Sequence, residues 1–163
     1  HDGPNQGGPD RRGRPSAQGQ LQEDDAEVKI QPVEPPHVHQ VWDQVEPFLT
    51  RAFEFSCGDC NADHAKVYLV QGRWQLLVAV NEDEKIVGAA CVEYIMRPNH
   101  RVGFFTAVGG KFLTSGEVLS QVSHILKLNG ATKIEGAARD SVARLWKSKF
   151  GFSEKHKIVE VSL

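Results

Sequence analysis

Two glutamates lie in stretches that otherwise predict buried strands. Glu93 interrupts the apolar run Val-Glu-Tyr-Ile-Met, and Glu135 lies within Lys-Ile-Glu-Gly-Ala-Ala. A carboxylate in such surroundings costs free energy unless it has a partner or a chemical purpose, and a half-buried carboxylate is suited to act as a general base. Glu93 is the first candidate for that role and Glu135 the second. The alternative is that either glutamate faces water or pairs with an arginine such as Arg97 or Arg139.

A glycine-rich junction between a strand and a helix follows at residues 108–118. The residues that could bind a ligand there are Val108, Gly109, Gly110, Lys111 and Gly116. Bare backbone N–H groups and one cation at the start of a helix are a combination that binds phosphate. The other interpretation is structural, with the glycine pair ending a strand and Thr114 to Glu117 forming a capping box of Thr-x-x-Glu spacing. The residues alone leave both interpretations open.

Cys57 and Cys60 form a Cys-x-x-Cys pair, and His64 follows closely. A structural zinc site needs four ligands, and no second pair of this kind follows. A redox pair of the thioredoxin type lies at a strand-to-helix junction, whereas this pair lies between two predicted helices. We therefore predict no metal here but a tight turn with buried thiols, in which Asn61 caps the second helix.

Hydrophobic periodicity predicts an α/β domain with a mixed sheet. The expected order is a strand within 26–35, helices over 38–53 and 61–72, strands over 74–80, 86–96 and 101–108, a helix over 114–130, a strand within 131–138, a helix over 139–150 and a last strand over 156–163. The three consecutive strands should be antiparallel, because short turns connect them. The strand-helix-strand unit over 101–138 should form a parallel crossover. The sheet is thus mostly antiparallel, of about six strands, with one parallel pair and helices on both faces.

The helix predicted over 139–150 runs directly into Gly151 and Phe152. Its apolar positions are Val142, Leu145, Trp146 and Phe150. The order of all elements, together with this ending, resembles the GNAT acetyltransferase superfamily over residues 27–163. Within that superfamily the chain most resembles the short GNAT-like proteins of tailed bacteriophages, some of which are virion components. The resemblance implies that Gly151 ends the helix and that Phe152 starts a strand that re-enters the sheet.

The resemblance also implies a position for acetyl-CoA. In the family the cofactor lies where the fourth and fifth strands part, and its pyrophosphate sits on backbone N–H groups at the start of the next helix. Thr106 and the glycine-rich junction would then contact the cofactor, with the acyl group near Thr106 and Glu93. The usual loop pattern, Arg or Gln followed by x-x-Gly-x-Gly or Ala, is not matched here. Trp146 stands where the family usually has a tyrosine that acts as the general acid. Water or Ser148 would take the place of that tyrosine.

Two functions follow from the resemblance. The first is an N-acyltransferase that moves an acetyl group from acetyl-CoA to an amine. The second is a non-catalytic GNAT-like protein with a structural or interaction role in a phage virion or another assembly, because a fold does not determine a function. The corresponding locations are the cytoplasm of a bacterial host and the virion.

Composition and charge are those of a soluble globular domain. The chain has 163 residues, of which 40% are hydrophobic and 25% charged, and its net charge is -2. This balance supplies no broad electrostatic attraction to nucleic acid or to an anionic membrane. No apolar run approaches the roughly 18 residues of a membrane span, and no charged-then-apolar leader opens the chain. Three cysteines are too few for a disulfide framework, which favours a reducing compartment.

Residues 1–25 differ from the rest of the chain. They are rich in Gly, Pro, Gln and charge, and Leu21 is their only large apolar residue. Such a segment cannot bury enough surface to fold alone, so we predict a flexible polar arm ahead of a domain over 26–163. If the arm is ordered, another protein chain must stabilise it in an extended form. Three arginines, Arg11, Arg12 and Arg14, would then contact acidic surfaces of that partner, or else remain solvated.

Overall fold

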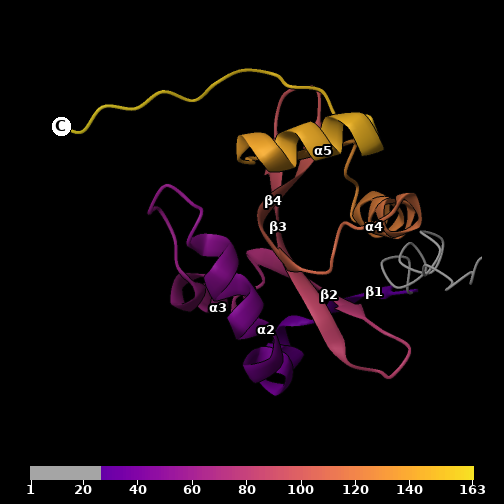
Figure 1. Ribbon diagram of the computed structural model, residues 1–163. Helices are drawn as coiled ribbons and strands as arrows, with labels where there is room; N and C mark the ends of the chain where they lie inside the picture. The colour runs from indigo at the N-terminus through magenta and orange to yellow at the C-terminus, as the bar shows by residue number, and fades with distance from the viewer. Residues whose placement is uncertain (1–26) are drawn as a thin grey trace, which may run out of the picture.

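The computed structural model describes residues 27–163, and Figure 1 shows their arrangement. The elements in chain order are β1 (Lys29–Val33), the 3-10 helix η1 (Pro35–His37), α2 (Val38–Phe53), α3 (Ala62–Val70), β2 (Trp74–Val80), β3 (Ile86–Met96), β4 (Arg101–Gly110), α4 (Gly116–Leu128), β5 (Lys133–Gly136) and α5 (Asp140–Phe150). The predicted arm over 1–25 lies outside the described residues, and so does the contact predicted for it.

The described residues form one mixed sheet with the strand order β1-β2-β3-β4-β5. The consecutive strands β2, β3 and β4 pair antiparallel, as predicted from the short turns between them, and β1 is antiparallel to β2. β5 is parallel to β4, from the pair Val102 and Lys133 to the pair Phe105 and Gly136. The predicted α/β class, with one parallel pair in a mostly antiparallel sheet, is confirmed.

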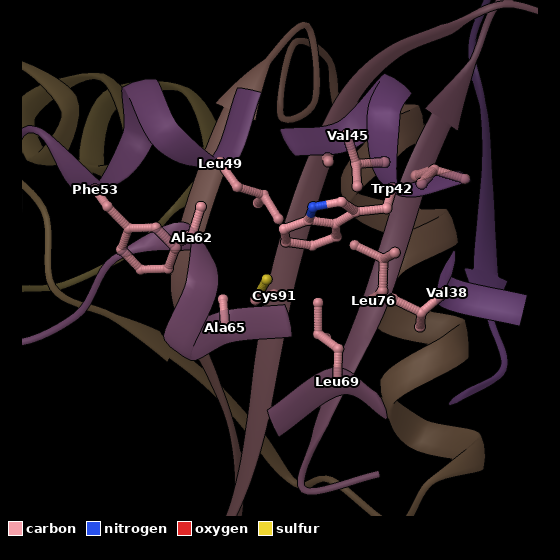
Figure 2. Close-up of a cluster of buried hydrophobic side chains, with 13 residues drawn as sticks. Val38, Trp42, Val45, Leu49, Phe53, Ala62, Ala65, Leu69, Leu76 and Cys91 are labelled. Carbon is pink, nitrogen blue, oxygen red and sulfur yellow. The ribbon is translucent and has the colours of Figure 1, made fainter. Parts of the chain in front are cut away.

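Helices cover both faces of the sheet, α2 and α3 on one side and α4 and α5 on the other (Figure 1). The alternation of strand residues produces these two layers. Leu76 and Cys91 point toward α2 and α3, whereas Leu77 and Val92 point toward α4 and α5. Figure 2 shows the first core, in which Trp42 of α2 lies among side chains from α3 and from the strands.

The two helices of the first layer form for reasons that the sequence displays. The buried residues of α2 follow one another at helical spacing: Val38, Trp42, Val45, Leu49 and Phe53. Asn61 caps α3 by accepting a hydrogen bond from the N–H of His64, and the His64 ring accepts one from the N–H of Asn61. The predicted cap is confirmed, and it employs His64 as a capping partner.

The predicted last strand, over 156–163, is wrong. Gly151 ends α5 with a φ of 72°, as expected, and the ring of Phe152 packs on Trp146 at 5.3 Å between centroids. Residues 151–163, however, belong to no helix or strand, and beyond Phe152 the chain runs away from the sheet (Figure 1). The exposed apolar side chains are Ile158, Val159, Val161 and Leu163. Alternating apolar residues are a local signal, whereas a strand also needs a neighbouring edge, and β5 on this side has only 4 residues.

Candidate functional site

The sheet opens between β4 and β5 at Thr106. The parallel pairing of these strands ends at Phe105 and Gly136, so the following residues of β4 pair with β3 alone. Thr106 is also an extra residue in the β3–β4 ladder, because Cys91 pairs with Ala107 and Val92 with Phe105. Its hydroxyl donates to the carbonyl oxygen of Cys91 at 3.3 Å. The structure therefore places Thr106, a predicted cofactor contact, where β4 gains a free edge.

The two predicted carboxylates lie on one row of the sheet, close to this opening. Glu93 of β3 is directly opposite Phe104 of β4, and Phe104 is opposite Glu135 of β5. Residues opposite one another on neighbouring strands point to the same face. Both carboxylates therefore point to the side of α2 and α3, with Phe104 between them, two residues before Thr106.

Glu135 is engaged in a bidentate ion pair. Its two carboxylate oxygens accept from Arg97, at 2.8 Å and 2.7 Å. The hydrogen bond from Arg97 lowers the pKa of Glu135, and the charges of Arg97, Lys133 and His156 act in the same direction, against a smaller opposing effect of burial. A carboxylate held in its charged form in this way is a weak base. The sequence had left this pairing open as an alternative, and the structure favours it for Glu135.

Glu93 differs from Glu135 in having no such partner. Within residues 27–163 its carboxylate makes neither an ion pair nor a side-chain hydrogen bond, and the residue is half-buried. Of the two predicted carboxylates, Glu93 is therefore the one available to accept a proton.

The predicted glycine pair lies inside β4 rather than after it. Gly109 pairs with Ala89 and Gly110 with Gly88, so the strand extends two residues beyond its predicted end at 108. A side chain at Gly109 would collide with the backbone of Phe48 in α2, and one at Gly110 would collide with the Phe48 ring and the carbonyl of Val87. The glycines therefore let α2 approach the sheet closely.

The remaining junction residues lead into α4. Val108 is half-buried, Lys111 is exposed, and Phe112 and Leu113 anchor the loop in the second core. The cap of α4 is Ser115, which accepts from the N–H of Val118 at 3.3 Å, so the predicted capping box at Thr114 is wrong by one residue. Gly116 begins the helix, and a side chain there would meet nothing within 4 Å. This helix start is open to a ligand.

A contact that the sequence did not predict joins α5 to this loop. Lys149 of α5 donates from Nζ to the carbonyl oxygen of Thr114 at 2.6 Å. Trp146, on the buried side of the same helix, packs against Gly136 at the end of β5. A lysine in the last turn of a helix is too common to single out from sequence. Its role becomes visible only once α4 and α5 are known to lie side by side.

The cysteine pair lies in the loop between α2 and α3. Cys57 is exposed, Cys60 is half-buried and Cys91 is buried, so the prediction of buried thiols is wrong for Cys57. Burial raises the pKa of Cys60 and, more strongly, that of Cys91. Among the described residues no group of three or more His, Cys, Asp or Glu is placed to hold a metal ion.

Two hollows of the described surface lie beside α4 and α5. One, of about 240 Å³, is lined by Asp140, Ala143, Arg144, Lys147 and Glu154. The other, of about 360 Å³, lies between β1, the turn after β2 and the start of α4. Neither includes a predicted site residue, but Glu117 in the first turn of α4 lines the second, which therefore adjoins this helix start. Over residues 27–163 no helix is long and apolar enough to span a membrane.

Comparisons with known proteins support this description of the fold. No family model and no curated protein matches the sequence. Among solved structures, an aminoglycoside acetyltransferase from an uncultured soil metagenomic sample, in complex with sisomicin, has a TM-score of 0.62 at 15% identity, over 85% of this chain and 98% of that one. A predicted acetyltransferase of Clostridium acetobutylicum with acetyl-CoA has a TM-score of 0.56 at 14% identity, over 83% and 96%.

A third similar structure is the ribosomal-protein-alanine N-acetyltransferase of Brucella melitensis biovar Abortus 2308. Its TM-score is 0.56 at 13% identity, over 84% of this chain and 98% of that one. At these identities the likeness concerns the fold, and it extends over nearly the whole length of each neighbour. The described chain therefore has the fold of the GNAT acetyltransferases.

Proposed function

We propose that the protein transfers an acetyl group from acetyl-CoA to an amine. The observation that carries this proposal is the parting of β4 from β5 at Thr106, two residues after the partner of Glu93, whose carboxylate has no ion pair among residues 27–163. A free strand edge, an open helix N-terminus and a base are the three parts that acyl transfer from a pyrophosphate-containing thioester needs.

The start of α4 fits a pyrophosphate. The Ser115 hydroxyl accepts from the N–H of Val118, whereas the N–H groups of Gly116 and Glu117 have no backbone partner in the described structure. Those two groups, the helix dipole and the ammonium of Lys111 would hold the anion. The carboxylate of Glu117 in the same turn opposes the anion and is exposed to solvent.

Acetyl-CoA, when bound, supplies the activated thioester. Glu93 takes one proton from the ammonium of the acceptor, and the freed nitrogen lone pair forms the new C–N bond. Backbone N–H groups near Thr106 and Ala107 would stabilise the oxyanion. As the C–S bond breaks, a second proton from the nitrogen goes to the thiolate, and Glu93 returns its proton to water.

The chain offers no tyrosine for that second proton. The Tyr94 hydroxyl donates to Gln75 at 2.6 Å, its ring packs with the core on the α4 side, and burial raises its pKa to about 12. Tyr68 packs on Trp74 in the other layer. The hydroxyl of Ser148 is exposed and donates to Leu145 within α5. Water is therefore the proposed carrier.

Calorimetric titration with acetyl-CoA and an assay of thiol release with added amines would test the proposal. Glu93→Gln should lower the turnover about 100-fold, the size of a typical general-base contribution, and leave acetyl-CoA affinity unchanged. Glu160→Gln, an exposed change in the segment after α5, is the matched control and should change neither. A protein that binds no acetyl-CoA, or a Glu93→Gln variant of full activity, would contradict the proposal.

A non-catalytic role in a tailed-phage virion or another assembly is the second candidate. It is favoured by the packing use of Gly109 and Gly110, and by Trp146 standing where the family usually has a tyrosine. In that case residues 1–25 would contact a partner chain. Failure to bind acetyl-CoA, together with capture of the protein in purified particles, would support this role.

A further inference from the structure

A row of four side chains crosses the sheet on the α2 and α3 side. Trp74 of β2 is directly opposite Glu93, Glu93 is opposite Phe104, and Phe104 is opposite Glu135. Directly opposite residues have Cβ atoms about 5 Å apart. The carboxylate of Glu93 therefore has an aromatic ring on each side of it. We call the first three of these residues, Trp74, Glu93 and Phe104, the aromatic row.

The aromatic row is sheltered but reachable. Along each strand it lies two residues from the pair of Leu76 and Cys91, which are buried under α2 and α3. All three of its members are half-buried. Side chains in this position are shielded from bulk water on one side, and a ligand can still reach them from the other.

The charges in this region leave one carboxylate without a cation. Arg97 neutralises Glu135, which lies beyond Phe104, whereas Glu93 has no ion-pair partner among residues 27–163. A half-buried carboxylate between two rings is stabilised by a cation, which would interact with the charge and with both ring faces.

One aromatic ring next to the row already binds a cation of the protein. Tyr68 packs against Trp74 with ring centroids 4.8 Å apart, and the guanidinium of Arg73 lies over Tyr68 at 4.5 Å. The packing of Tyr68 against Trp74 also fixes the orientation of the Trp74 ring. The Phe104 and Trp74 rings offer a ligand apolar surface without hydrogen-bond acceptors.

We propose that the aromatic row is the acceptor subsite, and that it selects a primary ammonium on an apolar stem over an amino sugar. The ammonium would contact Glu93 between Trp74 and Phe104, and the stem would lie along the rings. An amino sugar brings several ammonium and hydroxyl groups, each of which needs a polar partner, and the row supplies one unpaired carboxylate. Phe104 lies two residues before Thr106, so the nitrogen would be delivered to the open edge of β4. This inference rests on the proposed function.

Binding can be tested without acetyl-CoA. In NMR titrations of the whole protein, 3-phenylpropylamine should shift the Trp74 indole N–H, and it should bind at least about fivefold more tightly than the neutral 3-phenylpropanol. Glu93→Gln should remove that preference for the amine. Phe104→Leu and Trp74→Leu should each weaken amine binding about fivefold, whereas Phe150→Leu, which removes a ring of α5 on the other side of the sheet, should not.

The outcomes separate this inference from the proposed function. Equal binding of the alcohol and the amine, or tighter binding of an amino sugar such as kanamycin, would overturn the subsite. Thermal unfolding of each variant shows whether it is folded, and Glu93→Gln, which conserves side-chain volume, keeps the test valid if a ring variant fails to fold. Amine binding without acetyl transfer would contradict the proposed function and leave the subsite standing. Acetyl transfer that prefers kanamycin would support the proposed function and contradict the subsite.

Discussion

Lys149 donates from Nζ to the carbonyl oxygen of Thr114 at 2.6 Å, and so joins the last turn of α5 to the loop that precedes α4. The same loop leads into the helix start at which the pyrophosphate is proposed to bind. Since this lysine fixes the backbone there and adds a positive charge, it is expected to support acyl-CoA binding.

The first prediction concerns this contact. Lys149→Met should weaken acetyl-CoA binding about fivefold, in line with the net worth of about 1 kcal/mol of an exposed hydrogen bond. Lys147→Met is the control, because Lys147 lies two residues earlier and pairs with Glu154 instead. Calorimetric titration measures both. Equal losses in the two variants would show that only overall charge matters.

The second prediction concerns the close approach of α2 to β4. Gly110→Ala should lower the free energy of unfolding by about 3 kcal/mol, because Gly110 has a φ of 69° and its new methyl would overlap Phe48 and Val87. Gly116→Ala should change stability little, since that position is open. Urea denaturation measures both variants. A stable Gly110→Ala protein would mean that α2 does not pack this closely.

The third prediction concerns the ion pair of Glu135 and Arg97. Because the folded pKa of Glu135 is lowered, the pair stabilises the protein above the ordinary glutamate pKa, and this contribution is lost as the pH falls through the lower folded pKa. Arg97→Met should raise the pKa of Glu135 toward its ordinary value. Carbon NMR titration of the side-chain carboxyl checks this. Arg51→Met, an exposed change on α2, should leave it unmoved.

The fourth prediction concerns the thiols of Cys57 and Cys91. Cys57 is exposed and should react with a thiol-specific reagent in the native protein, whereas Cys91 should react only after unfolding, because it is buried and its pKa is raised. Mass spectrometry of labelled peptides distinguishes the sites. Cys57→Ser is the control and should remove the fast label. Native-state labelling of Cys91 would show that the core in Figure 2 opens readily.

The elements that sequence predicted well are those whose signals are local. The spacing of Trp42, Val45 and Leu49 defines α2, and Asn61 marks the start of α3. Short turns between consecutive strands determined the antiparallel part of the sheet. By contrast, the apolar alternation over 156–163 predicted a strand that the described sheet does not contain, because pairing depends on an edge elsewhere in the molecule.

The site could be predicted only in part for the same reason. Glu93 stood out as a charge in an apolar run, and the ion pair of Glu135 was one of two alternatives. The ring on each side of Glu93 could not be foreseen, because Trp74 and Phe104 become its neighbours only through the strand register. Ser115 and Thr114 are adjacent and equally suited to cap a helix, so the sequence alone could not distinguish between them.

The extra residue at Thr106 shifts the phase in which side chains alternate between the two faces along β4. Before it, the odd-numbered Phe105 points to the α4 side, and after it the odd-numbered Ala107 points to the α2 side. Substitutions at Thr106 leave this phase intact. A deletion of the residue would place Ala107 directly after Phe105 in regular alternation, so Ala107 and Gly109 would still face α2, and only the bulge would be lost. The packing of β4 should therefore tolerate both substitution and loss of Thr106, so a deletion that keeps stability but abolishes acetyl transfer would show that the bulge serves the site and not the core.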